Sequence, residues 1–228
     1  MTRSVSWAGA LLLAVIAVAV PGESAAQPRP ASRPAPAAPD PLRLRGLAEL
    51  ASFTFTASES FEAVLGTRSG TLFGGGVEVI LPQRIFASLR ASRFQKDGQR
   101  VFVFEGETFD LGIDTTVRIT PVEVTGGYRF AGAASRIAPY VGAGLGWHRY
   151  EETSESAEDD ENVNETHQGY HLLGGVEARI ARWFGLAGEI QWTTVPDALG
   201  QEPNAVSTAF GETNLGGVGF RVKFVVGR

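Results

Sequence analysis

Residues 116–130 read TVRITPVEVTGGYRF, and this stretch indicates the fold of the chain. Its second half places apolar or small residues at every other position from Val122 to Phe130, with Glu123 and Arg129 at positions between them. Successive side chains of a β-strand point to opposite faces, so the alternation predicts a strand with one apolar and one charged face. The charged face is otherwise occupied by Thr and Gly.

The same alternation recurs on both sides of this stretch and predicts eight strands. Seven further runs carry it, and the faces of the first stay unassigned because it alternates less cleanly: 47–56, 72–81, from 85 onward, 137–150, 168–180, 184–194 and 217–226. The connections after 81, after 130 and around 182 are short, whereas those at 57–71, 95–115, 151–167 and 195–214 are long. Short and long connections alternate strictly, which favours an up-and-down meander with one tight end and one loop-rich end.

The chemistry of the two faces favours a membrane barrel over a soluble one. A soluble barrel would bury the charged face or expose the aliphatic one, and each buried unpaired charge costs several kcal/mol. The small residues of the charged face suit the inside of a narrow closed barrel, so the aliphatic face has to meet lipid. We therefore predict an all-β fold, an eight-stranded antiparallel up-and-down transmembrane β-barrel over residues 47–226. A lipocalin-like soluble barrel with its faces exchanged is the alternative.

Aromatic residues are expected to form a girdle at each membrane interface. Near the predicted tight turns stand Tyr128, Phe130, Trp183, Phe184 and Phe224. Near the predicted long loops stand Phe94, Trp147, Tyr150, Tyr170 and Trp192.

Two segments precede the barrel. Residues 1–26 read as a cleavable signal peptide, because Arg3 is followed by an apolar run over 8–20 and by small residues at 24–26. An uncleaved anchor is the alternative, although the run is shorter than the roughly 20 residues that span a bilayer. Residues 27–46 are rich in Pro and Ala, and this composition predicts an extended linker in the periplasm.

Composition excludes several kinds of site. The chain has no cysteine, so it offers neither disulfides nor thiolate ligands nor a Cys nucleophile. Its net charge of −5 is set by residues 151–166, which hold eight acids and no base, and this argues against nucleic-acid binding. We expect the acidic segment to be a solvated outer loop; binding of divalent cations by its carboxylates is the alternative.

The charged faces together define a candidate interior network. Its predicted members are Glu78, Arg90, Glu123, Arg129, Glu177, Arg179, Glu189, Arg221 and Lys223. Such groups can pair and plug the barrel, or exchange partners and open a narrow gated path; eight strands leave room for little more than side chains, which favours the plug. The three histidines, His148, His167 and His171, have no Ser beside them on the same face, so we predict no catalytic site, no metal site and no cofactor.

Four quoted stretches carry a resemblance to a known family: TPVEVTGGYRF, RIAPYVGAGLGWHRYEE, GYHLLGGVEARIARWFGLAGEIQW and GGVGFRVKF. Over about 47–226 the chain resembles the small outer-membrane β-barrels of the OmpA transmembrane-domain and OmpX type. The resemblance implies export through the periplasm to the outer membrane of a Gram-negative bacterium and contact with its lipids and lipopolysaccharide. It also implies recognition by the outer-membrane assembly machinery through Gly219, Val222 and Phe224 of the last strand.

The implied role is a monomeric structural or surface-interacting barrel with acidic extracellular loops. A narrow porin-like channel for small solutes is the main alternative. A lipid-modifying outer-membrane enzyme is the more distant one, since it would need a His beside a Ser with a supporting carboxylate.

Overall fold

A computed structural model describes residues 42–104, 107–132, 135–154, 163–200 and 205–227. The predicted signal peptide, most of the predicted linker and the centre of the acidic segment, residues 155–162, lie outside the described residues.

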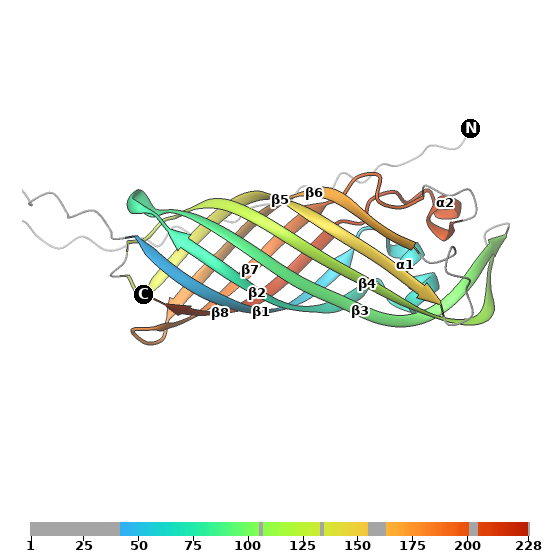
Figure 1. The fold of residues 1–228 in the computed structure, drawn as a ribbon, viewed down its shortest axis with the longest axis horizontal. Coiled ribbons are helices and arrows are strands. Elements are labelled where there is room, and N and C mark those ends of the chain that lie inside the picture. Colours follow the sequence, from blue (N-terminus) through green and yellow to red (C-terminus); the bar gives the residue numbers. More distant parts are fainter. Residues whose placement is uncertain (1–41, 105–106, 133–134, 155–162, 201–204, 228) are drawn as a thin grey trace, which may run out of the picture. The chain divides into compact units, whose positions relative to one another are not determined.

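Eight antiparallel strands close into a barrel in which each strand pairs with the next along the chain (Figure 1). The last strand pairs with the first, for instance Leu50 with Val222, so the sheet has no open edge. This confirms the predicted eight-stranded up-and-down barrel. The strands are β1 (Arg43–Phe55), β2 (Ser69–Ile80), β3 (Ile85–Phe104), β4 (Glu107–Arg129), β5 (Ile137–Ser154), β6 (Val163–Arg179), β7 (Phe184–Thr194) and β8 (Gly217–Gly227).

The faces point as the alternation predicts. Val124, Leu145 and Ile190 are 45%, 41% and 60% exposed on the outside, although they are aliphatic. Glu123 and Glu189, their neighbours in sequence, are buried inside the barrel. An outer surface of this composition is stable against hydrocarbon and unfavourable against water. No helix among the described residues is long and apolar enough to cross a membrane.

Strand β1 starts earlier than the alternation predicts. It begins at Arg43, inside the range 27–46 that was predicted to be linker, and not at Leu47. Its faces, which the sequence left unassigned, are now fixed: Leu44 and Leu50 point outward and Arg45 and Glu49 point inward. Pairing with β2 and β8 extends the strand, because Arg43 lies opposite Ile80 and Arg45 lies opposite Gly227.

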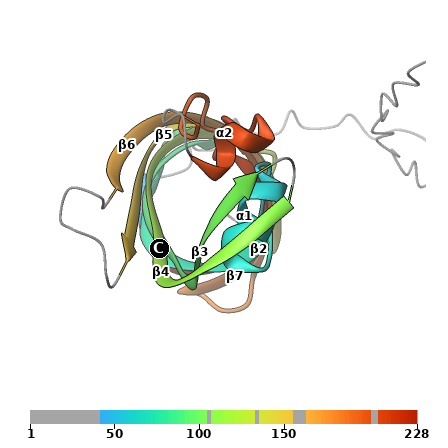
Figure 2. The same cartoon turned by 90° about the vertical axis from the view of Figure 1, so that its right-hand side faces the viewer.

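The two ends of the barrel differ as predicted, but the long connections hold more structure than expected. Helices α1 (Ser58–Leu65) and α2 (Val206–Phe210) lie at one end, over the mouth (Figure 2). The predicted loop 95–115 is instead a long hairpin, since β3 and β4 pair as far as Phe104 and Glu107. The opposite end has tight turns, one of them containing the 3₁₀ helix η1 (Pro82–Arg84).

Helix α1 is short and was not predicted, because eight residues carry only two turns of helical periodicity. Phe61 and Leu65 lie four positions apart and share one face, and both are buried. Gly66 ends the helix in the left-handed conformation, with its N–H donating to the Glu62 carbonyl. Tertiary packing of this face over the mouth stabilises the helix.

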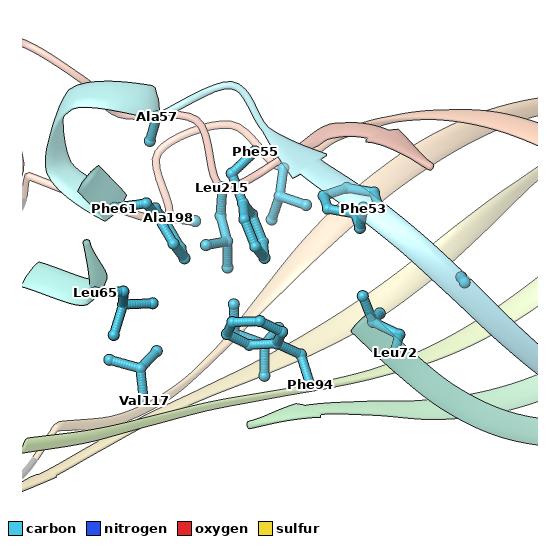
Figure 3. Packing of buried hydrophobic residues seen from close by; sticks show 13 residues of the cluster. Phe53, Phe55, Ala57, Phe61, Leu65, Leu72, Phe94, Val117, Ala198 and Leu215 are labelled. Carbon is cyan, nitrogen blue, oxygen red and sulfur yellow. The ribbon is translucent and has the colours of Figure 1, made fainter. Parts of the chain in front are cut away.

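A cluster of buried apolar side chains, which we call the mouth cluster, lies inside the barrel beneath α1 (Figure 3). Its members are Ala51, Phe53, Phe55, Ala57, Phe61, Leu65, Leu72, Phe94, Val117, Ile119, Val195, Ala198 and Leu215. Phe55 is its centre: its ring stacks on Phe61 at 4.0 Å between centroids and meets Phe94 edge-on at 5.3 Å. The placement of Phe94 and Tyr150 in the outer aromatic girdle is therefore wrong. Both face inward, because Phe94 shares the inner face of β3 with Arg90 and Tyr150 packs against this mouth cluster.

Inner glycines mark where neighbouring backbones leave no space for a side chain. A Cβ at Gly144 would stand 2.0 Å from the Val124 carbonyl oxygen, whereas a Cβ at Gly126 on the outer face meets nothing within 4 Å. We expect Gly144→Ala to lower the free energy of unfolding by about 1–3 kcal/mol through overpacking. Gly126→Ala, the matched control, should change it by less than about 1 kcal/mol. Urea titration of the heat-modifiable gel band measures both; equal losses would contradict the close packing inferred at Gly144.

Candidate functional site

Four charged residues form one group near the tight turns, which we call the turn-end cluster: Arg45, Glu78, Arg129 and Glu177. They come from β1, β2, β4 and β6. Arg45 binds Glu78 and lies 2.7 Å from Glu177, and Arg129 lies 3.0 Å from Glu177 and 3.8 Å from Glu78. Both bases therefore contact both acids, and all four residues are buried.

A second group, the central cluster, lies further along the interior and contains Glu49, Arg90, Glu123, Glu189, Arg221 and Lys223. Arg90 is its hub. Its guanidinium lies 2.8 Å from Glu189, 3.2 Å from Glu123 and 3.7 Å from Glu49. It also donates to the side-chain oxygen of Gln191 at 2.8 Å. The hub thus joins β3 to β1, β4 and β7 through side chains alone.

The remaining two bases of the central cluster come from β8. Arg221 lies 3.1 Å from Glu123 and 3.6 Å from Glu49, and Lys223 binds Glu189. Lys223 also stands 4.6 Å from the ring centre of Tyr140, and the Arg129 guanidinium stands 5.7 Å from the same ring. Tyr140 therefore lies between the two clusters, and its hydroxyl donates to Glu189 at 3.0 Å.

The charges of the two clusters balance. The turn-end cluster has two acids and two bases, and the central cluster has three of each. A buried ion costs several kcal/mol unless its partners offset the lost hydration. The equal number of acids and bases in each cluster provides those partners. Such an arrangement can hold strands in register and fill the lumen.

Eight of the nine predicted interior residues belong to these clusters. Arg179 does not: it is half-buried at the tight-turn end, and no ion pair links it to a carboxylate among the residues that the structure describes. Its position at the end of β6 puts it beyond the packed interior. Arg45 and Glu49 were not predicted from the sequence, although the alternation of Leu42 and Leu44 with their arginine neighbours could have identified the faces of β1.

Inside the barrel a threonine hydroxyl contacts a histidine ring. The two residues are 46 positions apart, so a search of the sequence for Ser beside His does not find them. The Thr125 hydroxyl is 2.8 Å from His171 Nε2, and His171 Nδ1 is 3.7 Å from Glu123. The hydroxyl, imidazole and carboxylate follow the order of a catalytic triad. Thr125 is only 1% exposed, however, and Glu123 is engaged by two arginines. In this structure the hydroxyl is therefore buried among the charged side chains of the interior.

The mouth carries an open cavity of about 340 Å³. Apolar side chains of α1 and of the β3–β4 hairpin form most of its wall, together with two charged groups, Arg100 and Glu152. The cavity lies above the mouth cluster, with Phe61, Leu65 and Val117 common to both.

The residues of the predicted assembly signal lie on β8. Phe224 is exposed on the outer face, and Gly219 is buried on the inner face. Val222 is half-buried and points outward between β1 and β7, opposite Leu50 and Gly188. Recognition by an assembly machinery remains a proposal for these positions.

Comparison with solved structures identifies the architecture. The chain is similar to the crystal structure of Neisserial surface protein A, with 13% sequence identity, a TM-score of 0.50 and coverage of 81% of this chain and 96% of that one. The fold is that of a small outer-membrane β-barrel. Outer membrane protein W of E. coli (16% identity, TM-score 0.48, 82% and 98% coverage) and a major outer membrane protein of Thermus thermophilus (10%, 0.48, 81% and 99%) also match. No family model and no curated protein matches the chain.

The balance of the turn-end cluster can be tested by a double-mutant cycle. Arg45→Met leaves one uncompensated buried carboxylate and should lower the free energy of unfolding by about 3–5 kcal/mol. Arg45→Met with Glu78→Met keeps the Arg129–Glu177 pair and restores neutrality, so it should recover most of that loss. Urea unfolding in lipid vesicles, followed by tryptophan fluorescence, gives these values and that of the Glu78→Met single variant. A double variant as unstable as the sum of its single variants would show that charge balance is not what matters.

Proposed function

We propose that this chain is a bacterial outer-membrane barrel that does not conduct and that acts, through its loop end, as a structural or surface-interacting protein. One observation carries the proposal: two neutral ion clusters and an apolar cluster are stacked along the interior. Water would have to displace all three layers to cross the barrel. The predicted signal peptide, residues 1–26, agrees with export through the periplasm.

The loop end has the rigidity of a contact surface. Glu212, which follows α2, accepts hydrogen bonds from the backbone N–H groups of Glu59 and Ser60 at 3.1 and 2.8 Å, and from the Ser60 hydroxyl at 2.6 Å. The carboxylate thereby satisfies free N–H donors in the first turn of α1 and joins two loops that are remote in sequence. A surface fixed before contact loses less conformational entropy when it binds.

Electrical recording separates this proposal from a porin-like channel. In a planar bilayer in KCl, we expect the refolded chain to insert without producing conductance steps, because its lumen is filled. If the chain were a channel, the wild type would conduct, and Glu189→Gln in the central cluster would change the ion selectivity. Glu62→Gln, on the outside of α1, is the matched control. Steps in the wild type that respond to Glu189→Gln and not to Glu62→Gln would overturn the proposal.

Orientation in the membrane can be tested because the chain has no native cysteine. Glu62→Cys places a thiol on α1 at the loop end, and Ala181→Cys places one in the exposed β6–β7 turn. With a membrane-impermeant maleimide on intact Gram-negative cells, we expect labelling of Glu62→Cys alone. Ala181→Cys should react only after the outer membrane has been permeabilised. The reverse pattern would contradict a periplasmic location for the tight turns.

A further inference from the structure

The tight-turn end carries an excess of arginine. Apart from the neutral turn-end cluster, it holds five arginines and, among the residues that the structure describes at this end, no carboxylate: Arg43, Arg84, Arg136, Arg179 and Arg182. The loop end, by contrast, mixes both signs of charge, with pairs such as Arg149 and Glu151. The basic end therefore attracts anions over and above what the barrel interior requires.

Three of these arginines share one cavity. It has a volume of about 260 Å³ and lies between the start of β1, the end of β8 and the β6–β7 turn. Its charged wall consists of Arg43, Arg45, Arg179 and Arg182 with a single acid, Glu177. Arg45 and Glu177 bind each other at 2.7 Å, so the positive field of the cavity is assigned to Arg179 and Arg182.

Two of the three guanidinium groups are available for an anion. Neither Arg179 nor Arg182 forms an ion pair or a hydrogen bond through its side chain with any residue in the described part of the chain. Arg182 lies 5.9 Å from the ring centre of Trp183, which holds it at the cavity rim. Arginine binds phosphate oxygens through a planar fork of N–H donors, and two such groups on one cavity match a single phosphate.

The aromatic part of the wall indicates where that phosphate comes from. Trp183, 52% exposed, and Phe184 line the same cavity, and Phe184 stacks on Phe224 of the outer face with centroids 6.2 Å apart. Through this contact the aromatic wall of the cavity adjoins the apolar outer face of the barrel. A ligand with a phosphate at one end and hydrocarbon at the other satisfies both parts.

We propose that this rim cavity binds the phosphate of an anionic phospholipid through Arg179 and Arg182. The proposal rests on the proposed function in one respect, since it needs the tight turns to lie at a membrane surface. The lipid would fix the height of the barrel in the bilayer and shield the basic end from other anions. The same phosphate chemistry could be supplied by a free phosphate ion, and the experiment separates these two sources.

The test compares lipid retention by the refolded full chain and by two double variants. Arg179→Ala/Arg182→Ala removes the proposed ligands, and Arg68→Ala/Arg149→Ala, the matched control, removes two arginines of the loop end. Native mass spectrometry from mixed micelles counts bound phosphatidylglycerol against phosphatidylcholine. We expect the wild type and the control to prefer phosphatidylglycerol, and the rim variant to lose at least about tenfold of that preference.

A separate arm adds inorganic phosphate or glycerol phosphate without lipid. Weak binding of these ions, with phosphatidylglycerol retained in their presence, supports the lipid. Displacement of phosphatidylglycerol by inorganic phosphate at comparable concentration would overturn the lipid in favour of a free phosphate site, and equal lipid preference in all three proteins would overturn the site itself. The heat-modifiable gel band is read on each sample. A chain that forms no such band contradicts the barrel, whereas a band without lipid preference contradicts only this inference.

Discussion

Mutual neutralisation of ten buried ionic side chains is the constraint on which the rest of the barrel depends. Every base of the two clusters has an acid within 4 Å, and each cluster is neutral by itself. The pairs join strands that are remote in sequence: Arg45 on β1 and Glu177 on β6 are 132 residues apart. A slip of one residue in any strand that carries these charges would turn them toward lipid and leave their partners unpaired. The ionic interior therefore selects one register for seven of the eight strands; β5 contributes no member of the two clusters.

Long charged side chains fit inside eight strands only because their neighbours are small. Gly76 faces Arg90 across the β2–β3 pair, and a Cβ there would approach the Arg90 backbone to 2.9 Å. Gly144 makes room for the ring of His171 in the same way. The high glycine content and the charged inner face are thus one feature of the sequence, since each needs the other in a barrel of this width.

The strand number, the faces and most of the interior network could be predicted because period-two alternation reports side-chain direction residue by residue. Arg45 and Glu49 were missed where Gly46, Ala48 and Ala51 blur the contrast between faces. Which acid binds which base was beyond reach, since pairing depends on the tilt of strands around a closed barrel. Helix α1 was missed for a different reason: its stability comes from packing over the mouth, which no local pattern reports. The long β3–β4 hairpin, also missed, is held by strand pairing as far as Phe104 and Glu107.

The order of the layers explains why the two ends of the barrel can serve different purposes. At the mouth the aromatic rings of Phe55, Phe61 and Phe94 pack against one another, so the loop end of the interior is apolar. Below these rings the charged side chains of the two clusters are buried and contact one another. The two ends of the barrel thus present different surfaces: the loop end is structured and carries both signs of charge, and the tight-turn end is basic.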